Sequence, residues 1–189
     1  MLTIAVRAAR KAGDLAVRYL DRLDGVEIGV KGHNDYVTEV DRRAEQIVIQ
    51  TLQDAYPDHA FLGEESGQHG DGEYVWIIDP LDGTTNYLHG FPQFAVSIAL
   101  QHRGVLDQAV VYDPLRAELF TASRGAGAQL NNRKIRVSRP KDLQSSLLGT
   151  GLPFRDFSHL DEYLKTLRHF MTRCSGVRRA GAASLDLAY

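Results

Sequence analysis

Two acidic pairs in the sequence are the strongest candidates for chemistry. Asp79 and Asp82 stand three residues apart directly after the apolar run 74–78, and Glu64 and Glu65 follow another short apolar stretch. Ligands gather at the carboxyl ends of strands in α/β folds, so the sequence predicts that these carboxylates converge. Carboxylates that meet repel each other unless a proton or a cation lies between them. Oxygen ligands without His or Cys favour Mg²⁺, with Mn²⁺ as an alternative, over zinc.

The residues around the second pair can aim its carboxylates at one point. Pro80 restricts the backbone after the first aspartate, and Gly83 permits a tight turn after the second. Thr84 and Thr85 then stand where a helix is expected to begin. Their hydroxyls and backbone N–H groups suit a phosphate or a positioned water.

Simpler interpretations of the same residues stay open on spacing alone. Asp-Pro and Asp-Gly are common turn dipeptides, so the run 79–85 is equally compatible with a plain strand–turn–helix junction. The glutamate pair alone is typical of a solvated loop. Asp41, three residues after Thr38, is typical of a capping residue. The seven histidines are too dispersed for a metal cluster, so we expect them on the surface or in loops.

Composition excludes several classes of protein. The 189 residues are 43% hydrophobic, as in a globular chain, and 22 basic against 24 acidic residues give a net charge of −2. This balance argues against strong direct nucleic-acid binding. A single cysteine, Cys174, excludes an internal disulfide and a Cys-rich zinc site. No apolar run approaches the roughly 20 residues of a membrane span, and the first residues do not resemble a secretory signal. The expected compartment is the cytoplasm, with no membrane contact.

Hydrophobic periodicity predicts an α/β chain of layered α+β character in two parts. Residues 1–140 form an N-terminal α+β part that carries the acidic motifs, and residues 141–189 form an incomplete C-terminal α/β part. Because the sequence stops inside an apolar helical pattern, we expect the last part of the fold to be missing. The elements expected are helices at 2–23, 38–55, 160–171 and from 183, strands at 60–63, 74–78, 94–101, 105–112, 118–122, 147–149 and 177–179, and a hairpin within 125–137.

Taken together, the motifs resemble those of the inositol monophosphatase family. The resemblance lies in Gly-Glu-Glu-Ser-Gly at 63–67, in the run 76–86 that contains Asp-Pro-Leu-Asp-Gly-Thr-Thr, and in the stretch 94–98. The bacterial SuhB-type branch is most similar, through residues 36–41 and 178–186. The likeness covers essentially the whole chain. It implies a layered αβαβα sugar-phosphatase fold, shared with fructose-1,6-bisphosphatase, and dependence on Mg²⁺.

The resemblance also implies a set of metal ligands. Glu64 and Asp79, with the backbone carbonyl of Leu81, would hold a first metal. Asp79 and Asp82 would hold a second, with Asp79 bridging the two. Glu65 would act in the outer shell, on a third and loosely held metal. A further aspartate of the family's second site lies beyond residue 189, so we expect that metal to be weakly held and the chain alone to be weakly active or inactive.

The same resemblance assigns catalytic and substrate-binding roles. Thr84, hydrogen-bonded to Asp41, would orient the attacking water, so the expected catalytic residues are Asp41, Glu64 and Thr84. Backbone N–H groups at the helix start would bind phosphate oxygens, and a later small-residue segment would line the inositol ring. The expected substrate-binding residues are Asp82, Gly83, Thr84, Gly181, Ala182 and Ala183.

The implied reaction is the hydrolysis of a small phosphate monoester, inositol-1-phosphate, by metal-activated water. Sugar bisphosphates and nucleotide 3′-phosphates are alternatives within the fold. Another class of function is a non-catalytic regulatory protein that acts with RNA polymerase and antitermination factors in transcription. Arg178, Arg179 and the arginines of the first helix would then serve as contacts. The resemblance also implies a homodimer.

Overall fold

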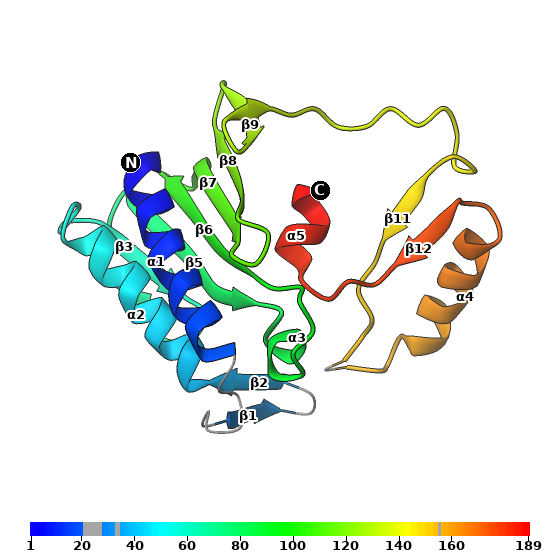
Figure 1. Cartoon of the computed structure of the whole chain (residues 1–189), viewed down its shortest axis with the longest axis horizontal. Coiled ribbons are helices and arrows are strands. Elements are labelled where there is room, and N and C mark those ends of the chain that lie inside the picture. Colours follow the sequence, from blue (N-terminus) through cyan, green and yellow to red (C-terminus); the bar gives the residue numbers. More distant parts are fainter. Residues whose placement is uncertain (21–27, 33–34, 155) are drawn as a thin grey trace.

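The computed structural model describes residues 1–20, 28–32, 35–154 and 156–189. Its main feature is an eight-stranded sheet in the order β10-β9-β8-β7-β6-β5-β3-β4. Helices α1 (Leu2–Leu20) and α2 (Glu39–Gln53) pack side by side against this sheet (Figure 1). The strands are β3 (Ala60–Gly63), β4 (Gly67–His69), β5 (Tyr74–Asp82), β6 (Ala95–His102), β7 (Val105–Asp113), β8 (Glu118–Ser123), β9 (Gly127–Leu130) and β10 (Arg133–Lys134).

Small side chains allow α1 to lie close to its neighbours. Its buried face consists largely of alanines at helical spacing, and Gly13 lies against the ring of Tyr112 on β7. The second helix begins as the sequence predicts, because Thr38 and Asp41 form a reciprocal capping box. Its apolar face, which includes Val48 and Leu52, completes a core with the sheet. Burial of these faces is what holds both helices in place.

The end of β5 contains an irregularity that matters for the site. The strand continues to Asp82, four residues beyond the expected end at 78. Asp79 pairs with Ser97 and Asp82 with Ala95, so β5 advances three residues where β6 advances two. Residues three apart on a regular strand point to opposite faces, and one extra residue reverses that alternation. The bulge therefore lets both aspartates face the same side, and Pro80, which has no N–H, lies within it.

The rest of the sheet follows the predicted meander. Strands β5 to β10 pair antiparallel, whereas β3 pairs parallel with β5. The hairpin between β9 and β10 turns at Asn131 and Asn132, whose φ values of 47° and 65° are those of a left-handed turn. Strand β4 is not among the strands that the sequence predicts, because Gly67–His69 lies in a polar, glycine-rich stretch. It forms through backbone pairing with β3 alone.

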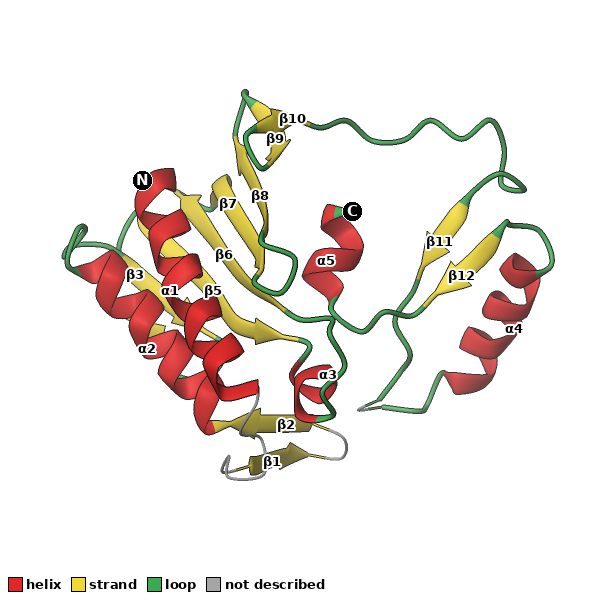
Figure 2. Cartoon of the chain, viewed as in Figure 1, coloured by secondary structure: helices red, strands yellow, loops and turns green. Residues whose placement is uncertain are grey.

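Smaller elements complete the described chain. Strands β1 (Ile28–Gly32) and β2 (Asp35–Thr38) pair antiparallel, and α3 (Thr84–Leu88) follows β5. Strands β11 (Leu147–Gly149) and β12 (Gly176–Arg178) form a separate parallel pair beside α4 (Leu160–Met171), as Figure 2 shows. The last helix, α5 (Ala183–Ala188), returns to the large sheet, where Leu185 packs with Phe120. The division at residue 140 stays a prediction, and residues 21–23 of the expected first helix lie outside the described range.

No helix in the described part of the chain has the length and apolar character that crossing a membrane requires.

One of the seven histidines, His59, lies in a loop as expected and also packs against the core. His59 precedes β3 and is half-buried between the rings of Tyr56 and Tyr74, with centroids 4.9 and 4.7 Å away. Its Nδ1 accepts a hydrogen bond of 3.0 Å from Nε1 of the fully buried Trp76. Burial lowers the pKa of His59 below its usual value, although the nearby Asp58 carboxylate opposes the shift.

This arrangement predicts a pH-dependent loss of stability. The lowered pKa of His59 stabilises the fold above the unfolded-state pKa, and this contribution is lost as the pH falls through the folded-state pKa. Protonation also removes the acceptor for Trp76. In urea denaturation we expect the free energy of unfolding of the wild type to fall between about pH 8 and about pH 5. For His59→Asn it should fall less, because the amide oxygen can still accept the bond from Trp76 and carries no titrating proton. His69→Asn, at an exposed position, is the control and should follow the wild type.

Candidate active site

Strand register brings the first two expected ligands together. In the parallel pair β3–β5, Gly63 lies opposite Ile78, so the next residues, Glu64 and Asp79, emerge side by side. The backbone N–H of Glu64 donates to the carbonyl of Ile78 at 3.0 Å and extends the pairing by one step. The side chains of Glu64 and Asp79 lie close enough for Glu64 to raise the pKa of Asp79. The predicted convergence of the two acidic motifs is present for this pair.

The electrostatics of the pair favour a proton on Asp79 when no cation is bound. Burial, followed by the charges of Glu64 and Asp82 and the hydrogen bond to Glu64, raises the pKa of Asp79 to about 8. A divalent cation can take the place of that proton and remove the repulsion. The two carboxylates and the nearby carbonyl of Leu81 are hard oxygen donors that fit Mg²⁺. The described residues contain no group of three or more His, Cys, Asp or Glu side chains placed to hold a metal ion.

The carboxylate of Asp82 is bonded to the start of α5 and does not complete a three-carboxylate group with Glu64 and Asp79. Its Oδ2 accepts hydrogen bonds from the backbone N–H and the hydroxyl of Ser184, at 2.6 and 2.5 Å. Its Oδ1 accepts from the N–H of Ala183 at 3.2 Å. The carboxylate therefore caps α5, whose N-cap residue, Ala182, offers no side-chain bond of its own. Asp82 remains close enough to Asp79 to raise its pKa.

Thr84 and Asp41 form the hydrogen bond that the family resemblance implied. The Thr84 hydroxyl lies 3.0 Å from Oδ1 of Asp41 and 3.1 Å from the carbonyl of Leu81. The other carboxylate oxygen of Asp41 accepts from the N–H and hydroxyl of Thr38, at 2.8 and 2.5 Å. Asp41 thus both caps α2, as its spacing predicted, and orients Thr84. Burial raises the pKa of Asp41 against the opposing effect of these hydrogen bonds.

Two glycines allow distant segments to meet beside these groups. Gly83 has φ of 96°, and a Cβ there would lie 2.9 Å from the carbonyl of Gln93. Gly181 has φ of 91°, and a Cβ there would press against the side chain of Asn86. The Asn86 amide donates to the carbonyls of Gln93 and Ala180, both at 2.8 Å. The segment 180–184 is thereby held next to residues 82–86.

Three residues without a predicted role support this arrangement. Asn86 and Ser184 make the long-range bonds described above, which no local pattern could reveal. Glu45 on α2 accepts bonds from the N–H groups of Glu65 and Ser66. Its signal in the sequence is its position four residues after Asp41, which places both carboxylates on one face of the helix.

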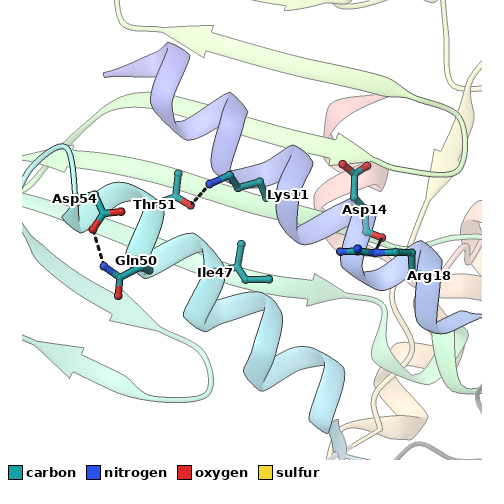
Figure 3. A pocket seen from close by; sticks show the side chains of 7 residues that line it. All are labelled: Lys11, Asp14, Arg18, Ile47, Gln50, Thr51 and Asp54. Carbon is teal, nitrogen blue, oxygen red and sulfur yellow. Dashed lines mark hydrogen bonds between the residues drawn. The ribbon is translucent and has the colours of Figure 1, made fainter.

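Of two hollows on the surface, one lies away from the expected site residues and the other borders them. One, of about 370 Å³, lies between α1 and α2 and contains none of the expected site residues (Figure 3). Lys11 reaches across it to Thr51 on α2 at 3.4 Å. A larger hollow of about 830 Å³ is bordered by Glu45, Glu65 and Ser66. It therefore reaches the turn that follows Glu64.

Comparison with known proteins agrees with the geometry. The family model described as "Inositol monophosphatase family" matches residues 1–189. The chain belongs to the inositol monophosphatase family. It is 57% identical over 195 residues to a protein of Pseudomonas aeruginosa named "Nus factor SuhB", with 100% of this chain and 72% of that protein covered.

Two solved structures of the family share the fold. The extragenic suppressor protein SuhB from Bartonella henselae matches with a TM-score of 0.96 and 46% identity, over 99% of this chain and 72% of that one. The Thermotoga maritima IMPase matches with a TM-score of 0.89 and 34% identity, over 100% of this chain and 71% of that one. The predicted inositol monophosphatase fold class is confirmed.

The raised pKa of Asp79 predicts that magnesium binding is coupled to proton release. Below about pH 8 the cation must displace the proton on Asp79, so we expect affinity for Mg²⁺ to rise up to about tenfold per pH unit and to level off above about pH 8. Calorimetric titration with Mg²⁺ in buffers of different ionisation enthalpy measures both quantities. Asp79→Asn should bind weakly and without this pH dependence. A wild-type affinity independent of pH would contradict the raised pKa of Asp79.

The cap on α5 predicts a specific loss of stability. Ser184→Ala removes a hydroxyl that donates to the charged Asp82, so we expect the free energy of unfolding to fall by about 1–2 kcal/mol in urea titrations. Ser175→Ala is the matched control, because that exposed hydroxyl donates to a neutral carbonyl, of Gln144. Its cost should be smaller. An equal cost for both variants would show that Asp82 does not anchor α5 through its charge.

Proposed function

We propose that this chain acts as a Mg²⁺-dependent phosphomonoesterase that hydrolyses inositol-1-phosphate to inositol and phosphate. The observation that carries the proposal is the pairing of Glu64 and Asp79 at the ends of β3 and β5, beside the hydrogen bond between Thr84 and Asp41. Membership of the inositol monophosphatase family supports a phosphatase activity in general. The ordinary reaction of such a site is attack of water on a phosphate monoester.

The metal ligands follow from the donors available. Glu64, Asp79 and the carbonyl of Leu81 would hold a first Mg²⁺, and Asp79 with Asp82 a second. Glu65 would act from the outer shell. When bound, these cations neutralise the charge of the phosphate, lower the pKa of water and stabilise the leaving alkoxide. Because Asp82 also caps α5, we expect the second cation to bind more weakly than the first.

Thr84 would position the attacking water. A hydroxyl has one proton and two lone pairs, and the proton of Thr84 is directed to Asp41 or to the carbonyl of Leu81. The lone pairs of the Thr84 oxygen remain free to accept a hydrogen bond from water. A water that donates this bond keeps its own lone pairs free, and one of them can then be directed toward phosphorus. Asp41 thus acts by fixing the direction of the hydroxyl.

The phosphate would lie between this water and the ring, because water attacks phosphorus in line with the leaving oxygen of the ring. The first N–H groups of α3, beginning at Gly83 and Thr84, precede its first intrahelical bond, from Tyr87 to Gly83, and can donate to phosphate oxygens. The small residues of the segment Gly181–Ala183 leave room for a polyhydroxylated ring. Sugar bisphosphates and nucleotide 3′-phosphates are the alternative substrates, to be compared with inositol-1-phosphate by measuring phosphate release.

A regulatory role is the second candidate, and one observation favours it. The relative from Pseudomonas aeruginosa is named a Nus factor, and 57% identity over all of this chain is high. We propose as the alternative that the chain binds RNA polymerase or antitermination factors, with the exposed Arg178 and Arg179 as contacts. A homodimer is proposed for either role.

Asp79→Asn separates the two candidates. The substitution removes the shared charge of both proposed metal sites, so we expect phosphate release from inositol-1-phosphate to fall by about 100-fold or more. Asp71→Asn, in an exposed loop, is the control and should retain the wild-type rate. Survival of the cellular function in the Asp79→Asn strain would favour the regulatory role. Undiminished phosphate release by this variant would contradict the proposed active site.

A further inference from the structure

Glu45 is a buried carboxylate that the proposed reaction does not use. It lies on α2 with only 2% of its surface exposed. A carboxylate removed from water is costly unless hydrogen bonds replace the lost solvation. Both of its oxygens are bonded: Oε2 accepts from the N–H of Glu65 and Oε1 from the N–H of Ser66, each at 2.9 Å. A charged acceptor makes such bonds stronger than neutral ones.

These bonds fasten the turn that carries Glu64. The two donors are the backbone groups directly after Glu64, and the N–H of Glu64 itself is bonded to Ile78. The residue before Glu64 contacts the same carboxylate, because a Cβ on Gly63 would collide with the carboxyl group of Glu45. The backbone on both sides of Glu64 is therefore fixed against α2.

We propose that Glu45 is a positioning residue for the magnesium site: by holding the turn 63–66, its carboxylate keeps the Glu64 side chain beside Asp79. This inference rests on the proposed metal site. Glu45 does not itself touch the metal in this role, since its two oxygens face backbone N–H groups. It raises the affinity for the metal by fixing the position of Glu64 before the cation binds, so that binding costs less conformational entropy.

The test is calorimetric titration of the full chain with Mg²⁺ alone, together with urea denaturation without metal. Glu45→Gln retains the shape but turns an amide NH₂ toward one of the two N–H donors. We expect its dissociation constant for Mg²⁺ to rise by about 10-fold or more. Unchanged magnesium affinity in the folded variant overturns the inference.

Asp113→Asn is the matched control. Asp113 is also buried, with 1% exposure, and its carboxylate also accepts two backbone N–H bonds, from Leu115 and Arg116 at 2.9 and 3.0 Å. It fastens the turn after β7 and has no place in the proposed site. We expect it to lose stability while its magnesium affinity stays within about 2-fold of the wild type. A loss of affinity equal to that of Glu45→Gln would mean a general loosening of the fold and overturns the inference.

Gly63→Ala disturbs the same contact from the other side and serves if Glu45→Gln does not fold. Its methyl group displaces the carboxylate, so magnesium affinity should fall in the wild-type background. In the Glu45→Ala background the space is free, and the same substitution should cost no further affinity. Additive losses in the double variant overturn the inference.

The two proposals fail in distinguishable ways. Absence of magnesium binding by the wild type overturns both the metal site and the role of Glu45. Magnesium binding without phosphate release contradicts only the proposed function, because the affinities of the variants still report on Glu45.

Discussion

The repulsion between Glu64 and Asp79 is the constraint on which the rest of the site depends. Parallel register between β3 and β5 brings the two carboxyl groups together, and burial, followed by the charges of Glu64 and Asp82, raises the pKa of Asp79 to about 8. Such an arrangement is unfavourable for stability alone, since an apolar pair would avoid the cost. A chain that maintains it gains a place where a proton and a divalent cation compete for the same oxygens.

Helix α2 supports both halves of this site with one pair of side chains. Asp41 and Glu45 are four residues apart and therefore share a face of the helix. Asp41 accepts from Thr84, which follows β5, and Glu45 accepts from the turn after β3. The capping box at Thr38 fixes where the helix begins and so fixes both carboxylates relative to the strands. Helix α2 thus holds the ends of both β3 and β5 in place.

Local pattern was sufficient for much of this and failed where distant segments meet. Alternation and capping residues predicted helices at 2–23 and 38–55, where the structure has Leu2–Leu20 and Glu39–Gln53, and they predicted the meander from β5 to β8, because each element depends on its own sequence. The bulge at Pro80 was not predicted, since it depends on the register with β6. Nor could spacing show that Asp82 would cap a helix about a hundred residues later. The sequence predicted that Glu64, Asp79 and Asp82 converge, and the structure places Glu64 and Asp82 near Asp79; only the structure shows that Asp82 also caps α5.

That sharing has a thermodynamic consequence. Three hydrogen bonds from Ala183 and Ser184 compete with any cation for the oxygens of Asp82. Burial and the charge of Asp82 also raise the pKa of Asp186 on α5. The charge of Asp82 therefore acts on a second group of the same helix. Two events that draw on one carboxylate are energetically linked, and the linkage is reciprocal. A second cation, as proposed, would loosen the start of α5, and firm docking of α5 would weaken that cation by the same factor.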